Sequence, residues 1–148
     1  MAGDLPGAVL FACSQNAIRS PMAEGLMRHL YGHKLYVASC GVRRGEPDPF
    51  VVTVMDELGI DVRRHRPQSF DELQGDSFDL IVSMSPEAHH WAVEMTRTNA
   101  LEAEYWPTID PSLTEGTREQ KLEAYRQVRD TLRVRLLSRF GSHGAGGV

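Results

Sequence analysis

The chain has 148 residues, the size of one domain, and a chain of this length buries about two-thirds of its unfolded surface. Its net charge of −4, with 24% charged and 41% hydrophobic residues, excludes an overall basic field for nucleic acid or an anionic membrane. No apolar run is long enough to span a membrane, and two cysteines are too few for a disulfide framework. The first residues lack a secretion signal. We therefore expect a cytoplasmic protein with free thiols, a monomer or weak dimer, that binds neither nucleic acid nor membrane.

Short apolar runs that suit buried strands alternate with helical patterns along the chain. We expect strands at residues 8–12, 35–38, 80–83 and 103–106. The first helix should begin after Ser20 as N-cap, with Pro21 at its first position. Asp48 and Ser85, each followed by proline, should open two further helices.

Two capping boxes complete the predicted elements. Residues 69–72 predict a short helix, and residues 117–120 open a long final helix that meets Gly141. Alternating strands and helices favour right-handed crossovers and an α/β three-layer sandwich, a parallel sheet flanked by helices on both faces. Residues 1–140 should form one domain, and residues 141–148 a flexible tail.

The first predicted strand runs directly into a cysteine, a short turn and an arginine. In the spacing Cys-x5-Arg, the turn after the strand can point successive backbone N–H groups inward and bind a tetrahedral oxyanion at a helix N-terminus. Arg19 can clamp two phosphate oxygens while Cys13 attacks phosphorus as a thiolate. The helix N-terminus, Arg19 and the Ser20 hydroxyl would each stabilise that thiolate.

A leaving oxygen needs a proton, so a general acid should lie elsewhere in the fold. Asp110 is the candidate, because it follows the last predicted strand at the edge of the sheet where Cys13 should lie. Pro107 and Pro111 would stiffen its loop. The alternative is that Asp110 only forms the turn before Pro111.

At these residues the chain resembles the low-molecular-weight protein tyrosine phosphatases and the related thioredoxin-coupled arsenate reductases. The shared features are a Cys-x5-Arg-Ser loop at residues 13–20, the stretch Pro-Met-Ala-Glu at residues 21–24, a segment at residues 59–65, and the pair Asp110-Pro111. Strand, loop, helix and distant Asp-Pro in this order make the resemblance specific.

This resemblance implies a four-stranded parallel sheet with the phosphate loop after the first strand, no metal and no organic cofactor. It implies Cys13 as nucleophile, Arg19 as phosphate clamp and Asp110 as general acid and base, acting through a phosphocysteine intermediate on a phosphorylated protein or a small phosphate ester. Asn16 would steady the loop, and Ser20 would stabilise the thiolate. The residues expected around phosphate are Ser14, Gln15, Asn16, Ala17, Ile18, Arg19 and Ser20.

The chain also departs from the family pattern. Gln15 replaces a glycine, at a position where a positive φ is often required. Ile18 replaces a cysteine that forms a protective disulfide in many eukaryotic members. The aromatic residues that usually flank the pocket are missing, since residues 41–46 and Ser112-Leu113 contain none. Residues 83–91 hold no cysteine, so the redox relay of the arsenate reductases cannot operate.

Several alternatives stay open. The protein could be an arsenate reductase that uses an external thiol, or a non-catalytic phosphate-binding module with Cys13 inert. Cys40 is expected to pack in the core. His89-His90 should form a solvated helix face rather than a metal site, and His65 an exposed basic turn with its arginine neighbours or, alternatively, a protein-docking patch. Trp106 would line the pocket mouth or close the core.

Overall fold

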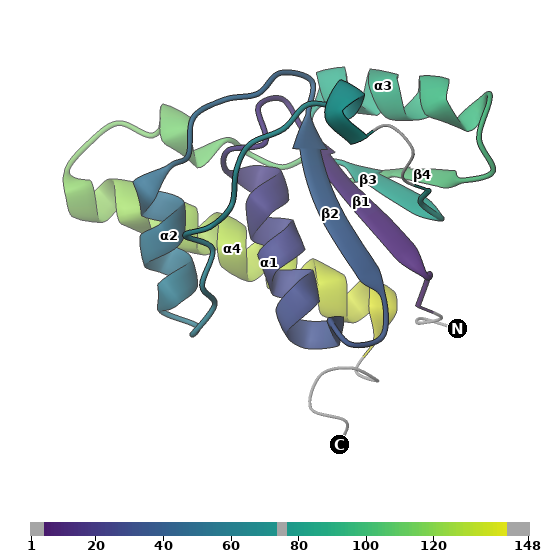
Figure 1. Cartoon of the computed structure of the whole chain (residues 1–148). Helices are drawn as coiled ribbons and strands as arrows, with labels where there is room; N and C mark the ends of the chain where they lie inside the picture. The colour runs from purple at the N-terminus through teal and green to yellow at the C-terminus, as the bar shows by residue number, and fades with distance from the viewer. Residues whose placement is uncertain (1–4, 74–76, 142–148) are drawn as a thin grey trace.

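The computed structural model describes residues 5–73 and 77–141, and its centre is a parallel sheet of four strands. The strand order is β2-β1-β3-β4, with every neighbouring pair parallel (Figure 1). The strands are β1 (Ala8–Cys13), β2 (Tyr36–Gly41), β3 (Leu80–Ser83) and β4 (Glu102–Tyr105). The predicted α/β fold is therefore confirmed. The proposed tail at residues 142–148 lies outside the described residues.

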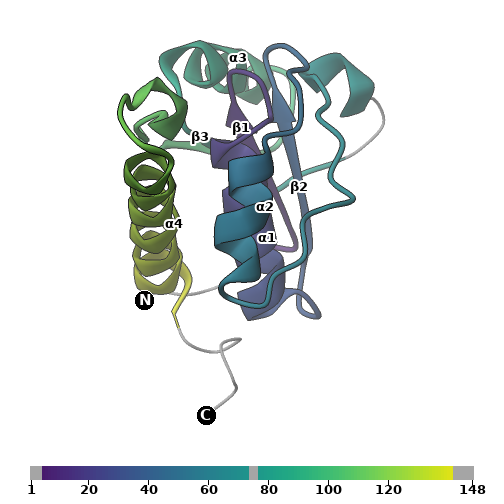
Figure 2. The same cartoon turned by 90° about the vertical axis from the view of Figure 1, so that its left-hand side faces the viewer.

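Helices cover both faces of the sheet. In Figure 2, one group of helices lies on the face of the sheet toward the viewer, and another helix lies behind the sheet. The front helices are α1 (Arg19–Tyr31), α2 (Pro49–Asp56) and α4 (Arg118–Phe140), and the helix behind is α3 (Pro86–Thr96). Two short 3-10 turns, η1 (Phe70–Leu73) and η2 (Pro111–Leu113), complete the fold. Among residues 5–73 and 77–141, no helix has the length and apolar character needed to cross a membrane.

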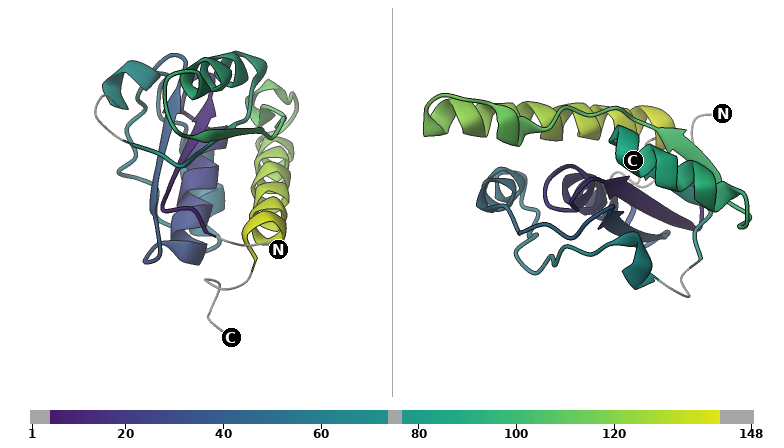
Figure 3. Two further views of the ribbon diagram at one scale, coloured as in Figure 1. Left: turned by 90° about the vertical axis from the view of Figure 1, so that its right-hand side faces the viewer. Right: turned by 90° about the horizontal axis from the view of Figure 1, so that it is seen from above.

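The central strand β1 divides the hydrophobic core in two. Val9 and Phe11 belong to the larger cluster with α1, α2 and α4, whereas Leu10 and Ala12 belong to the smaller cluster with α3. Successive strand residues point to opposite faces, so a strand covered on both faces must be apolar throughout. Figure 3 shows the two helical layers with the sheet between them.

Most predicted helix starts are confirmed. Asp48 caps α2, Ser85 caps α3, and Thr117 forms the expected capping box with Gln120 at the start of α4. Ser69 and Glu72 are hydrogen-bonded at the expected short helix, which is a single 3-10 turn. These caps satisfy N–H groups that the first helical turn leaves without partners.

The predicted start of α1 is wrong. The helix begins at Arg19, two residues before the expected Pro21, and its N-cap residue is Ile18, which provides no side-chain cap. Ser20 therefore lies inside the first turn, where its hydroxyl is used for other contacts. The first N–H groups of α1 remain available to an anion.

The parallel register aligns the strand ends that carry the site. Cys13 at the end of β1 pairs with Gly41 at the end of β2, which extends β2 three residues beyond the predicted strand. The chain after β4 continues this edge, since the Trp106 N–H donates to the Ser83 carbonyl and the Thr108 N–H to the Met84 carbonyl. Cys13 and the loop that holds Asp110 therefore meet at the carboxyl edge of the sheet, where ligands bind in such folds.

Candidate active site

The loop between β1 and α1 directs its backbone N–H groups into a cavity. Its carbonyl oxygens are held from outside: those of Cys13, Ser14 and Gln15 accept N–H groups from residues 42–45, and that of Asn16 contacts His65 Nε2 at 2.9 Å. In a trans peptide, a carbonyl and the next N–H point in opposite directions. The amides of residues 14–17 therefore face inward, and within the described chain they donate to no protein acceptor. Such a nest binds a tetrahedral anion.

The thiol of Cys13 sits beneath this nest and is almost fully buried. Its Sγ lies 2.9 Å from the Ser20 Oγ. The Ser20 oxygen accepts a hydrogen bond from Asn16 Nδ2 at 2.9 Å, and its single proton has two acceptors in reach: the Cys40 carbonyl at 3.3 Å and, once the thiol is ionised, the Cys13 sulfur at 2.9 Å. The hydroxyl proposed from the family resemblance to stabilise the thiolate is thus beside it, and that use explains why it does not cap α1.

Asn16 is the residue at which the loop reverses direction. It has φ 56°, the one positive φ at a non-glycine position in the described residues. Its side chain is fully buried, with Nδ2 donating to Ser20 and Ser39 and Oδ1 accepting from the Gln68 N–H. Asparagine tolerates this region better than most residues, and its three side-chain partners, together with His65 on its backbone carbonyl, fix it there.

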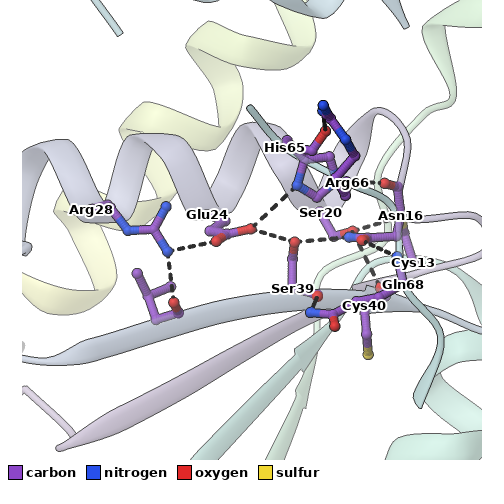
Figure 4. Close-up of polar contacts among 11 residues, drawn as sticks. Cys13, Asn16, Ser20, Glu24, Arg28, Ser39, Cys40, His65, Arg66 and Gln68 are labelled. Carbon is purple, nitrogen blue, oxygen red and sulfur yellow. Dashed lines mark hydrogen bonds and ion pairs between the residues drawn. The ribbon is translucent and has the colours of Figure 1, made fainter. Parts of the chain in front are cut away.

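Glu24 and His65 form a second layer behind Asn16, as Figure 4 shows. Ser39 donates to Glu24 Oε1 at 2.5 Å, and His65 Nδ1 lies 3.9 Å from the same oxygen. The side chain of His65 is only 18% exposed. The expectation that His65 belongs to an exposed basic turn is therefore wrong, because its ring reaches under the loop. Sequence spacing gave no signal for this contact across 49 residues.

A cavity of about 250 Å³ opens above Cys13, and it brings most of the predicted site residues together. Arg19 lines it and donates to the Thr108 carbonyl at 3.1 Å, which ties the loop after β4 to α1. Asp110 also lines the cavity, and its Oδ1 accepts from the N–H and hydroxyl of Ser112. The other predicted residues that line the cavity are Ser14, Gln15, Ala17 and Ile18, whereas Asn16 and Ser20 lie behind it.

Gln15 does not adopt the positive φ expected at its position, since the next residue does. The room for its side chain comes from glycine on the neighbouring segment: a Cβ on Gly45 would lie 2.8 Å from the Gln15 Cβ. Likewise, a Cβ on Gly41 would lie 2.7 Å from the Asn16 nitrogen. The loop geometry therefore depends on two glycines outside it.

Charged and polar groups replace an aromatic wall at the cavity mouth. Arg43 lines the cavity and forms two hydrogen bonds to Glu87, at 2.9 and 2.8 Å. These bonds lower the pKa of Glu87, against the opposing effect of its partial desolvation. Ser14 donates to Ser85 at 3.1 Å beside this pair. Two contacts thus join the loop region to the start of α3.

The structure agrees with some of the remaining sequence expectations and contradicts one of them. Cys40 is fully buried, and burial followed by the charge of Cys13 raises its thiol pKa, in keeping with a packing residue. Trp106 is also buried, in edge contact with Phe11, so it closes the core. His90 is exposed, but His89 stacks on Tyr105 and contacts Ser83 Oγ, so the solvated-face prediction is wrong for it. No group of three potential metal ligands occurs in the described part of the chain.

A phosphate-binding loop after the first strand of a parallel sheet, closed below by a buried thiol, defines a class of cysteine-based enzymes that act on oxyanions. The family model for the low molecular weight phosphotyrosine protein phosphatases matches residues 8–140. The chain therefore belongs to this family.

Relatives within the family carry two kinds of name. An arsenate reductase of Halalkalibacterium halodurans is 32% identical over 86% of this chain and 91% of its own. A glutaredoxin arsenate reductase of Synechocystis sp. is 29% identical over 86% of this chain and 92% of its own. The structure of a low molecular weight protein tyrosine phosphatase from T. tengcongensis superposes with a TM-score of 0.67, at 28% identity over 86% of this chain and 92% of its own. Family membership thus supports phosphatase-like, cysteine-based chemistry.

Proposed function

We propose that the protein hydrolyses phosphate monoesters, as a low-molecular-weight tyrosine phosphatase does, through a phosphocysteine intermediate. The observation that carries this proposal is the set of inward amides above Cys13, with Arg19 and Asp110 on the walls of the same cavity. The backbone amides and the guanidinium group bind the equatorial oxygens of the phosphoryl group in the transition state of its transfer. A cytoplasmic location, where thiols stay reduced, belongs to the same proposal.

The reaction proceeds in two displacements. The Cys13 thiolate forms the S–P bond as the ester P–O bond breaks, and Asp110 gives its proton to the leaving oxygen. Asp110, now a carboxylate, then takes a proton from a water molecule that attacks phosphorus. The S–P bond breaks, phosphate leaves and the thiolate is restored. Ser20 stabilises the thiolate at both ends of this cycle.

The cavity mouth supports a polar phosphate ester or phosphorylated protein as substrate. Arg43, Gln15 and Ser112 line it in place of the aromatic side chains that would stack on a phenyl ring. Phosphotyrosine and small esters belong to this class. Phosphoarginine is not an ester, but a phosphorylated protein that carries it offers Cys13 the same phosphorus atom, with the P–N bond breaking and Asp110 protonating the leaving nitrogen.

Replacement of the nucleophile tests the mechanism. Cys13→Ser should abolish hydrolysis of para-nitrophenyl phosphate while inorganic phosphate still binds, because the amides and Arg19 are unchanged. Asp110→Asn should reduce turnover of alkyl phosphates, which have poor leaving groups, far more than that of para-nitrophenyl phosphate. Turnover retained by the Cys13→Ser variant would contradict the proposal. An absence of turnover in the wild-type protein would favour a non-catalytic phosphate-binding module.

Arsenate reduction with an external thiol is the second candidate, favoured by the names of the relatives. Its two electrons would have to come from outside the chain, because residues 83–91 contain no cysteine and Cys40 is fully buried. Arsenate incubated with the protein and either glutaredoxin, thioredoxin or a small thiol distinguishes the two activities. The phosphatase proposal predicts no arsenite above the level of the Cys13→Ser control.

A further inference from the structure

We propose that the protein has a second anion-binding site, separate from the phosphate loop, in a cavity between α1 and residues 59–66. The cavity has a volume of about 480 Å³, nearly twice that of the cavity above Cys13. Its ligand would be a small organic polyanion that carries phosphate or carboxylate groups. The site does not depend on the proposed reaction, since it shares no lining residue with the catalytic cavity.

The charges around this cavity favour an anion. Both of its carboxylates are already paired: Glu24 with Arg28 at 2.6 Å, and Asp61 with Arg63 at 3.0 Å. The hydrogen bonds from Arg63 lower the pKa of Asp61 to about 2.

Arg64 and Arg66 supply the charge that these pairs do not neutralise. Both line the cavity, and neither has a carboxylate within ion-pair distance in residues 5–73 and 77–141. His29 lines the cavity as well. Guanidinium groups bind phosphate and carboxylate oxygens through paired N–H donors, so two of them on one rim suit a ligand with more than one anionic group.

The walls suit an organic ligand better than a bare ion. Pro21, Ile60 and Val62 line the cavity between the charged groups. Ligand sites typically combine a volume of about 300–1,000 Å³, an apolar lining and a few polar groups that fix orientation. A single phosphate would fill only part of this space.

The cavity also contacts the network that holds the phosphate loop. Glu24 and His65 line it, and both reach toward Asn16, the first through Ser39 and the second directly (Figure 4). An anion that draws Arg28 from Glu24 changes the charge balance on this network. Ligand binding at the second site should therefore perturb the hydrogen bonds that hold the phosphate loop.

The proposal is tested with citrate and tripolyphosphate as probes, titrated into ¹⁵N-labelled Cys13→Ser protein at constant ionic strength. Backbone amides of residues 24–29 and 59–66 should shift along one saturation curve with a common Kd. In an Arg64→Ala, Arg66→Ala double variant that Kd should rise at least about tenfold, because the charge-assisted hydrogen bonds are lost. Arg133→Ala removes one such positive charge from the exposed surface of α4 and should leave the Kd unchanged.

Each outcome separates the possibilities. A response to tripolyphosphate alone assigns a phosphate ligand, and a response to citrate alone assigns a carboxylate. Shifts confined to residues 14–19, shifts that do not saturate, or shifts that the folded double variant retains would overturn the site. Arg66→Gln, a milder change at an exposed position, should give an intermediate Kd. Gln68 lies outside the lining, so its amide tests the link to the loop: a shift there with the same Kd supports the link, and its absence overturns it.

Discussion

The Ser20 hydroxyl has two possible roles: it could cap the N-terminus of α1, or it could contact the Cys13 thiol. A serine before a proline at a helix start is an N-cap signal. In the structure the hydroxyl contacts the Cys13 thiol, and α1 begins without a side-chain cap. An uncapped helix N-terminus beside the cavity above Cys13 leaves its first N–H groups available to an anion. The missing cap and the contact between Ser20 and Cys13 therefore both suit the proposed site.

Ser20→Ala should lower kcat for aryl phosphate hydrolysis roughly 10–100-fold, since a hydrogen bond to a charged group contributes about 1.5–3 kcal/mol. Phosphate affinity should change much less, because the amides and Arg19 are intact. Steady-state kinetics and product inhibition by phosphate give both values. Ser83→Ala serves as control, because Ser83 is equally buried but does not contact the thiol. An equal effect of the two substitutions would contradict the role of Ser20.

Asn16 combines a left-handed backbone with a side chain that has several partners, and two substitutions separate these properties. Asn16→Gly allows the same left-handed backbone conformation but removes the hydrogen bonds to Ser20, Ser39 and Gln68. Asn16→Ala removes the same bonds and also adds backbone strain at φ 56°. We expect both variants to lose activity, and the alanine variant to be less stable by about 1 kcal/mol. Urea unfolding and turnover measure the two effects. Full activity of Asn16→Gly would show that only the backbone matters.

At the scale of elements, the segment after β2 braces the phosphate loop. Residues 42–45 hold three loop carbonyls, and the absence of side chains at Gly41 and Gly45 permits this approach. Gly41→Ala should push the loop away, because its Cβ would meet backbone atoms at 2.6–2.7 Å. We expect phosphate affinity to fall at least about tenfold, the equivalent of 1.4 kcal/mol. Calorimetry with phosphate measures it, and unchanged affinity would exclude a bracing role.

The strands, the helices and the phosphate loop could be predicted because their signals are local. Short continuous apolar runs predicted β1 and β3. Asp48, Ser85 and Thr117 predicted the starts of their helices, because each caps N–H groups only a few residues away. Contacts between distant segments left no such signal. The bonds from Asn16 to Ser39, His65 and Gln68 cross 23 to 52 residues, and only folding brings them together.

At the scale of the whole molecule, α4 is tied to the rest of the fold by carboxylates that contact its middle and its C-terminal end. Glu57, beyond the end of α2, accepts from Arg126 and Arg129, the latter almost buried. Glu104 in β4 accepts from Arg139 at 2.8 Å. Because α4 covers the larger core cluster, loss of these ties should weaken the packing of the whole domain.

Glu104 gives this attachment a defined pH dependence. Burial raises the pKa of its carboxyl, but the hydrogen bonds from Arg139 and Trp106 outweigh burial and bring the pKa below the ordinary value of 4.5. A lowered folded-state pKa contributes stability that is present above the ordinary value and is lost as the pH falls through the folded value. Glu104→Gln should therefore lower Tm by roughly 2–4 °C at pH 7, for a loss of about 1 kcal/mol. As the pH falls below 4.5 and through the lowered folded-state pKa, the two proteins should converge in thermal unfolding experiments. A constant difference across this range would show that packing, not charge, is lost.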